Sequence, residues 1–225
     1  VCLDTEGAQL RTLLLSDKII VKEHDIIEFV DGIKLASNTQ IGIRGCEIEK
    51  VFKNGDLVSI DFDGAVVQII EHQESSILGR VLHSGNIGNN KGVNVDRLLR
   101  LNSFTHKDEK AFSLCQSIGI KHLFLSFCSH ESDVDDLRNK FSYDIKVISK
   151  IESKNGLINL DGICDKSDAL LIDRGDLSRE VPLEKIPTAQ KYILQRGNTH
   201  NVPVYVATNL MENMIINSKP TRAEV

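Results

Sequence analysis

The sequence KVISKI at residues 146–151 has the composition of a strand buried on both faces of a sheet. It is short, nearly continuous in apolar residues and rich in β-branched side chains, whereas a half-exposed strand alternates apolar with polar residues. Three more runs of this kind lie on either side of it along the chain, at His122–Phe127, Ala169–Ile172 and Val202–Ala207. Together the four runs predict neighbouring strands of a parallel sheet.

Stretches with helical character separate these strands. Residues 132–138 begin with a Ser that can cap a helix and with acids that suit a first turn. Gly156–Cys164 and Leu183–Gln195 each place apolar side chains on one helical face, the second of them including Ile193 and Leu194. Strand and helix alternating every 25 to 30 residues or so indicate an α/β fold. Since no single glycine-rich phosphate loop follows the first strand, a (β/α)8 TIM-type barrel is favoured over a Rossmann sheet, incomplete here because about five βα units are present.

Residues 13–91 have a different pattern, with short apolar runs and closely spaced turn signals such as Asn54-Gly55. Leu57–Asp61 and Val66–Ile70 have strand composition, so this region predicts a small all-β domain built of hairpins. The glycine-rich stretch Gly85–Gly92 has no Walker or dinucleotide spacing and predicts a flexible hinge.

An apolar strand at Val1–Leu3 precedes the β-rich region, which is therefore expected to be an insertion. The expected domains are a partial catalytic (β/α) barrel, residues 1–12 and 92–225, and an inserted β-barrel-like lid, residues 13–91. The chain is expected to be part of a longer polypeptide.

The composition narrows the function classes. Hydrophobic residues make up 41% and charged residues 26% of the 225 residues, which predicts a folded core. A net charge of -5 argues against a nucleic-acid-binding surface and a polybasic membrane patch. The apolar runs are too short to cross a membrane, so a cytoplasmic protein is expected. The five cysteines form no CxxC pair, which argues against a disulfide scaffold and a cysteine zinc site.

The polar residues that could carry chemistry follow the predicted strands, where α/β folds place their sites. Lys150 and Glu152 are two residues apart and point to the same side of the strand end. The next strand ends in Asp173 and leads to Asp176, and the last ends at Ala207-Thr208-Asn209. Glu152 and Asp176, from adjacent strands, suit a hard divalent ion such as Mg²⁺. A solvated Lys150–Glu152 ion pair and a helix-capping role for Asp176 are the simpler alternatives.

Six motifs, in order and spread over the whole chain, resemble those of the pyruvate kinase family. They are DTEGAQLRT at 4–12 (DTKGPEIRT in the family), KGVN at 91–94, ISKIE at 148–152, RGDL at 174–177 (RGDLG), ATNLMENM at 207–214 (ATQMLESM) and PTRAE at 220–224. The resemblance implies a TIM-type barrel with a β-rich lid inserted after its third strand. It also implies transfer of a phosphoryl group from phosphoenolpyruvate to ADP, giving pyruvate and ATP in glycolysis.

The resemblance assigns a role to each matching residue of the central site. Glu152 and Asp176 match the ligands of the catalytic Mg²⁺ or Mn²⁺. Lys150 matches the lysine that stabilises the transferred phosphoryl group and the enolate of pyruvate. Gly175 and Asp176, through their backbone, and Thr208 match the groups that hold the carboxylate of phosphoenolpyruvate, with Thr208 near the face where the enolate is protonated.

Outside the central site the resemblance is less complete. Arg11 matches a residue that reaches the nucleotide phosphates, and Asp4 and Thr5 match ligands of a monovalent cation. Glu6 replaces a lysine, and Gln9 replaces an acidic residue linked in the family to K⁺ dependence, so the K⁺ requirement is left open. Family members are commonly homo-tetramers, which implies a homo-oligomer here.

Two other functions are compatible with the central residues. One is a divergent lyase or aldolase of the same superfamily that stabilises an enolate without ADP, and the retained Arg11 and lid argue against it. The other is a catalytically inactive regulatory relative, and the intact central residues argue against that.

Overall fold

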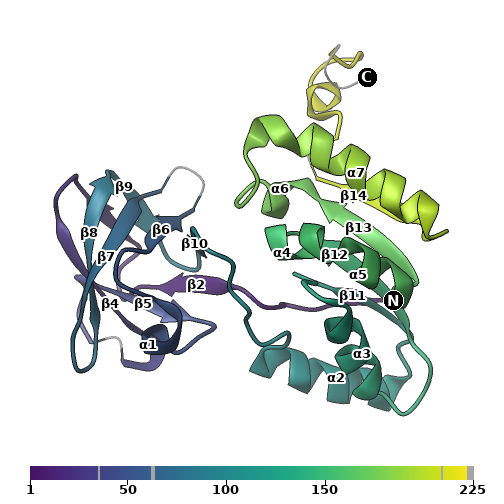
Figure 1. The fold of residues 1–225 in the computed structure, drawn as a ribbon, viewed down its shortest axis with the longest axis horizontal. Helices are drawn as coiled ribbons and strands as arrows, with labels where there is room; N and C mark the ends of the chain where they lie inside the picture. Colours follow the sequence, from purple (N-terminus) through teal and green to yellow (C-terminus); the bar gives the residue numbers. More distant parts are fainter. Residues whose placement is uncertain (35, 62–63, 209, 222–225) are drawn as a thin grey trace. The chain divides into compact units, whose positions relative to one another are not determined.

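The computed structural model describes residues 1–34, 36–61, 64–208 and 210–221. The chain divides into two compact units, the α/β unit, Val1–Gly7 with His106–Val225, and the β-barrel unit, Ala8–Thr105 (Figure 1). The β-barrel unit is thus inserted in the α/β unit, but its bounds are wider than the predicted 13–91. The reason is that residues next to both predicted boundaries pair as strands of the β-barrel unit, as described below.

The α/β unit is built on a five-stranded parallel sheet. Its strands, in spatial order, are β1 (Leu3–Asp4), β11 (His122–Leu125), β12 (Lys146–Ile151), β13 (Ala169–Asp173) and β14 (Val204–Ala207). Each of the four apolar runs predicted as strands coincides with one of these strands, β13 extending one residue further to Asp173, so the parallel α/β arrangement is confirmed. Among the described residues the sheet is open, with β1 and β14 at its edges.

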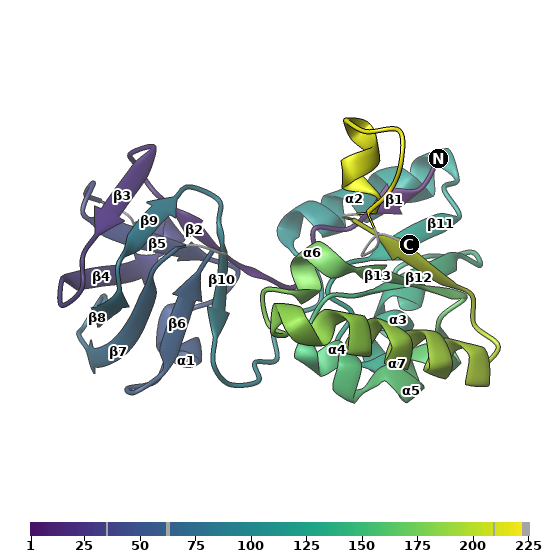
Figure 2. The same cartoon turned by 90° about the horizontal axis from the view of Figure 1, so that it is seen from above.

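Helices and short 3-10 turns connect the strands. They are α2 (His106–Ile118), α3 (Glu131–Asn139), α4 (Lys154–Ile158), α5 (Leu160–Lys166), α6 (Arg174–Leu177), η2 (Leu183–Lys185), α7 (Ile186–Thr199) and η3 (Glu212–Ile215). Helix α5 packs against both α3 and α7, and the three lie along one face of the sheet (Figure 2). The strand side chains that are completely buried alternate along the strands, for example Leu123, Val147 and Leu170. Lys150 and Asp173 are in the opposite phase of this alternation.

Two of the helix predictions need correction. Gly156–Cys164 is not one helix, because Asn159 leaves the helical conformation (φ -97°, ψ 18°) between α4 and α5 and its side chain donates a hydrogen bond to the Ser129 carbonyl at 2.8 Å. Leu194 is 38% exposed rather than buried, and Gly197 is the next buried residue after Ile193.

The β-barrel unit is a closed, seven-stranded barrel in the order β10-β2-β5-β4-β8-β7-β6. These strands are β2 (Leu10–Leu13), β4 (Ile26–Asp31), β5 (Gln40–Arg44), β6 (Leu57–Ile60), β7 (Val66–His72), β8 (Ile77–His83) and β10 (Gly92–Val95). Strand β10 pairs with both β2 and β6 and closes the barrel. For this reason β2 and β10 belong to the inserted unit, although both were expected at the margins of the catalytic barrel.

The rest of the β-barrel unit consists of a two-stranded ribbon, β3 (Lys18–Val21) with β9 (Gly85–Gly88), and of the short helices η1 (Gly32–Lys34) and α1 (Ile48–Val51). The predicted hinge at Gly85–Gly92 is therefore wrong, because β9 is fully paired and β10 begins at Gly92. Glycine is required at Gly85 since a Cβ there would lie 2.5 Å from the Gly64 carbonyl carbon. No helix of the described part of the chain is long and apolar enough to span a membrane.

Candidate active site

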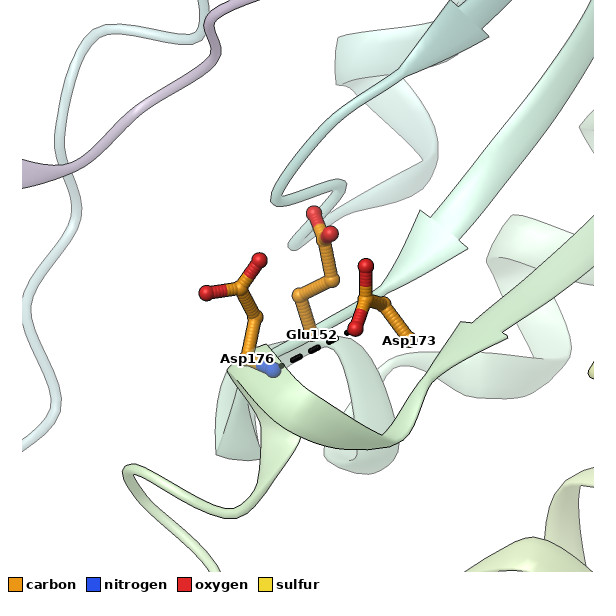
Figure 3. Close-up of side chains that lie close together, drawn as sticks. All are labelled: Glu152, Asp173 and Asp176. Atoms are coloured by element: carbon orange, nitrogen blue, oxygen red, sulfur yellow. Dashed lines mark hydrogen bonds between the residues drawn. The ribbon is translucent and has the colours of Figure 1, made fainter. Parts of the chain in front are cut away.

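Three carboxylates of the α/β unit converge where β12 and β13 end. Glu152 directly follows β12, Asp173 is the last residue of β13, and Asp176 lies in α6. One oxygen of each lies within 4.8 Å of one oxygen of both others, and the side chains face one another (Figure 3). Because parallel strands end at the same edge of a sheet, residues far apart in sequence meet here.

Glu152 is the most buried of the three, with 1% of its surface exposed. Its Oε2 accepts a hydrogen bond from the backbone N–H of Phe127 at 2.7 Å. Its Oε1 is buried and has no hydrogen-bond partner among the described residues, although Lys150 Nζ lies 3.1 Å away as an ion pair. Burial raises the pKa of Glu152 to about 7, against the opposing effect of Lys150 and with a smaller contribution from the negative charge of Asp176.

Lys150 extends from β12 into the same site, and its side chain is 12% exposed. Besides Glu152, its Nζ lies 3.2 Å from Ser126 Oγ and 3.5 Å from Asp4 Oδ1. Burial alone would lower the pKa of Lys150, but the carboxylates of Glu152 and Asp4 outweigh burial and raise it. The lysine is therefore a fixed cation at neutral pH. The predicted surface ion pair of Lys150 and Glu152 is in fact a buried one.

Asp173 organises the start of α6. Its Oδ1 accepts hydrogen bonds from the backbone N–H groups of Gly175 at 3.1 Å and Asp176 at 3.4 Å, and from Thr208 Oγ1 at 3.2 Å. Gly175 N also lies 3.0 Å from Thr208 Oγ1. The residue that caps this helix is thus Asp173 rather than Asp176, which instead pairs with Arg179 at 2.9 Å.

Most of the residues assigned to the central site by resemblance are close together in the structure. Lys150, Glu152 and Asp176 meet at the carboxylate cluster, and Gly175 and Thr208 join it through Asp173. The three donors matched to a substrate carboxylate, two backbone N–H groups and the Thr208 hydroxyl, all contact Asp173 Oδ1.

The other assigned residues lie around this cluster or in the other unit. Asp4 Oδ1 accepts a hydrogen bond from Ser126 Oγ at 3.0 Å, and Thr5 Oγ1 accepts one from the Ser126 N–H at 2.9 Å. Arg11 belongs to β2 of the β-barrel unit, where it donates to Gln9 Oε1 at 2.7 Å and to the Asn90 carbonyl at 2.8 Å. Asn209 and residues 222–224 of the PTRAE motif lie outside the described residues.

The sequence analysis assigned no role to Asp173, a member of the carboxylate cluster, or to Ser126, which contacts Lys150. Asp173 could have been identified as a site residue, since it is a carboxylate at the end of a predicted strand. Ser126 could not, because one serine after an apolar run has no distinguishing pattern.

The residues present fit a hard divalent ion. Carboxylate oxygens are the protein ligands that Mg²⁺ and Mn²⁺ prefer, and three of them converge here. Glu152 Oε1 points to the same conclusion, since it is buried and, although ion-paired with Lys150, accepts no hydrogen bond from the described residues.

The comparisons with known proteins agree on one family. The family model described as "Pyruvate kinase, barrel domain" matches residues 1–225. Curated pyruvate kinases of Borreliella burgdorferi and Thermotoga maritima are each 32% identical to the chain, over 99% and 100% of its length and 48% and 49% of theirs. A crystal structure of a pyruvate kinase from Cryptosporidium parvum superposes with a TM-score of 0.84 at 31% identity, covering 99% of this chain and 48% of that one. The chain thus spans about half the length of the curated relatives it matches.

Proposed function

The chain belongs to the pyruvate kinase family, and on this basis we propose that the protein transfers the phosphoryl group of phosphoenolpyruvate to ADP, giving pyruvate and ATP. The observation that carries the proposal is the buried ion pair of Lys150 and Glu152 beside Asp173 and Asp176. Phosphoryl transfer depends on positioning and charge neutralisation rather than on a covalent intermediate, and this cluster offers a fixed cation and convergent carboxylates.

Lys150 would neutralise negative charge at two stages. Its ammonium group is held by Glu152, Ser126 and Asp4, so it needs little reorganisation to face an anionic phosphoryl group. The same cation would stabilise the enolate oxygen that remains after the phosphoryl group leaves. Because its pKa is raised, Lys150 stays charged over the physiological range.

Glu152 and Asp176 would hold Mg²⁺ or Mn²⁺. When bound, the ion supplies Lewis-acid neutralisation of the phosphoryl and enolate oxygens. The Phe127 N–H fixes one oxygen of Glu152, leaving the other directed to the cluster, and Arg179 restrains Asp176.

The substrate carboxylate would bind at the backbone of Gly175 and Asp176 and at Thr208. These donors contact Asp173 Oδ1, so binding would exchange internal hydrogen bonds for bonds to substrate. Thr208 has a left-handed backbone (φ 65°), and its hydroxyl lies between β14 and α6, 2.7 Å from the Ala207 carbonyl oxygen and 3.0 Å from the Gly175 nitrogen. The same hydroxyl would assist protonation of the enolate.

The wider assignments remain part of the proposal. The β-barrel unit would act as the lid of a TIM-type barrel, with Arg11 binding nucleotide phosphates, and Asp4 and Thr5 would contribute to a K⁺ site. A cytoplasmic homo-oligomer, as in tetrameric relatives, is proposed by resemblance.

The decisive experiment measures pyruvate formation from phosphoenolpyruvate by the full-length protein with Mg²⁺, with and without ADP and with and without K⁺. We expect ADP-dependent pyruvate that falls at least about 10³-fold in Lys150→Met, the size expected when a buried charge that stabilises the transition state is removed. Lys146→Met is the matched control, since Lys146 is on the same strand but 64% exposed and paired with Asp168. Pyruvate formed equally without ADP would mean that the phosphoryl group goes to water rather than to ADP. A folded, metal-binding protein that forms no pyruvate would refute the kinase assignment and leave the enolate lyase and the inactive relative as the remaining functions.

A further inference from the structure

We propose that Asp173 is a third carboxylate ligand of the divalent cation held by Glu152 and Asp176. The inference rests on the metal site of the proposed function and adds a residue to which neither the sequence motifs nor the comparisons assign a role. Its basis is the convergence of Glu152, Asp173 and Asp176, one oxygen of each lying within 4.8 Å of one from both others.

The two carboxylate oxygens of Asp173 have different surroundings, since one accepts hydrogen bonds and the other faces the carboxylate cluster. All of those described go to Oδ1, which accepts from Gly175 N, Asp176 N and Thr208 Oγ1. The second oxygen of Asp173 points toward the Glu152 carboxylate, while the dashed bond from Asp176 N ends on Oδ1 (Figure 3). The three donors therefore fix the side chain in one orientation, with its other oxygen directed at the cluster.

A second observation, independent of the clustering of acids, points to a ligand at this position. Glu152 is 1% exposed, and its Oε1, although ion-paired with Lys150 Nζ at 3.1 Å, accepts no hydrogen bond from the described residues. A buried carboxylate oxygen that accepts no hydrogen bond keeps lone pairs available to a bound cation.

The charge balance also favours a dication. Two of the three carboxylates are paired with a cation, Glu152 Oε1 with Lys150 Nζ at 3.1 Å and Asp176 Oδ1 with an Arg179 nitrogen at 2.9 Å, whereas Asp173 forms no ion pair with the described residues. Asp173 therefore adds negative charge close to Asp176 and Glu152. Such charge is unfavourable without a cation and strengthens the binding of one, since the number of charged ligands tunes the affinity for hard divalent ions.

The simpler role for Asp173 is capping of α6 alone. The two roles respond differently to Asp173→Asn. The amide oxygen of Asn can still accept the three hydrogen bonds at the Oδ1 position, so the cap is kept. The negative charge is lost, and an NH₂ group, which cannot ligate a metal, replaces the second oxygen.

The test measures Mn²⁺ binding to the full-length protein without substrate or nucleotide, by the loss of the free-ion electron paramagnetic resonance signal. We expect Asp173→Asn to weaken Mn²⁺ binding at least about 10-fold, by removal of one charged ligand, with an unchanged unfolding midpoint in chelator. Asp136→Asn, the same change at an exposed acid on α3, is the matched control and should leave the affinity within about 2-fold, as for surface charges remote from a site. Glu152→Gln should abolish the binding event.

Mn²⁺ affinity unchanged within about 2-fold in Asp173→Asn would overturn the proposal and leave Asp173 as a cap. A wild-type protein that binds no Mn²⁺, or binding that survives Glu152→Gln, would overturn it as well. These outcomes are separate from those of the kinase assay. If the wild-type protein forms no pyruvate with ADP, the proposed function is refuted even when Mn²⁺ binding depends on Asp173. If it forms pyruvate but Asp173→Asn binds Mn²⁺ as tightly as wild type, only this inference is refuted.

Discussion

The β-barrel unit and the strand ends of the α/β unit each bury an acidic side chain, and the two differ in whether both carboxylate oxygens accept hydrogen bonds. In the β-barrel unit Asp56 is 8% exposed, and its oxygens accept hydrogen bonds from Lys53 N at 2.8 Å and from Arg97 Nε at 3.0 and 3.2 Å. At the strand ends Glu152 is more deeply buried, yet its Oε1 has no hydrogen-bond partner among the described residues. The first arrangement stabilises the fold, while the second stores unfavourable burial that a ligand can relieve.

The apolar residues of the barrel core also differ from those on the Lys150 side of the α/β sheet, in how deeply they are buried. Phe29 and Phe52 are almost completely buried and pack edge to face with ring centroids 5.7 Å apart. The closed barrel leaves no unpaired edge for its strands. Side chains of the α/β sheet on the side of Lys150 include Leu171, half-buried, and Tyr205, 56% exposed. The α/β unit has fully buried residues of its own, such as Val134 and Leu137, so the contrast is between the barrel core and the Lys150 side of the sheet rather than between the stabilities of the two units.

The largest expected effect is on Glu152. Glu152→Gln should lower ADP-dependent pyruvate formation about 10⁴-fold, equivalent to about 5.5 kcal/mol in the barrier. At the same time it should not lower the unfolding midpoint at pH 8, because the amide is less costly to bury than an ionised carboxylate.

Asp56→Asn is the matched change in the β-barrel unit, and it should lower the stability of the protein without changing its metal binding. We expect a loss of about 1–3 kcal/mol in the free energy of unfolding, since a partner of Arg97 becomes neutral, with unchanged Mn²⁺ affinity. If both variants lost stability to the same extent, the contrast between the two buried acids would be wrong.

Next in size is the apolar core of the β-barrel unit. Phe29→Ala should reduce the free energy of unfolding by about 3–5 kcal/mol, because it removes a fully buried ring and leaves a cavity beside Phe52. Urea denaturation measures this loss. Mn²⁺ affinity of the folded fraction should stay at the wild-type value, and a parallel loss of metal binding would show that the two units are not energetically separate.

A smaller effect is expected from pH on the free energy of unfolding of the metal-free protein. The pKa of Glu152 is raised from 4.5 to about 7 in the folded state, so between these values the folded protein holds a proton that the unfolded chain releases. Stability in chelator should therefore fall as pH rises through this window, by on the order of 3 kcal/mol. Unfolding midpoints at several pH values measure the slope, and Glu152→Gln should remove this part of it. A slope identical in wild type and variant would mean that Glu152 is not the group responsible.

The local sequence pattern predicted much of the α/β unit. Apolar, β-branched runs such as 146–151 identified each of the four long parallel strands, because a buried strand needs such residues whatever its partners. The acids after Ser132 likewise indicated α3, but the predicted cap was wrong, because the residue that caps this helix is His130 and Ser132 lies in its first turn. The break at Asn159 could not be read from the sequence, since it depends on a hydrogen bond to the Ser129 carbonyl, thirty residues away.

The sequence by itself determined the order of strands and helices and the presence of Lys150, Glu152 and Asp176 at strand ends, because alternation and chain direction are local properties. Only the tertiary structure decided that β2 and β10 close the β-barrel unit, since pairing across some eighty residues follows from register and closure. It also decided that Asp173 joins Glu152 and Asp176 in the carboxylate cluster and that Glu152 Oε1 is buried without a hydrogen-bond partner among the described residues. Burial and hydrogen-bond satisfaction belong to the packed environment of a side chain rather than to the residue, so no pattern in the chain could have shown them.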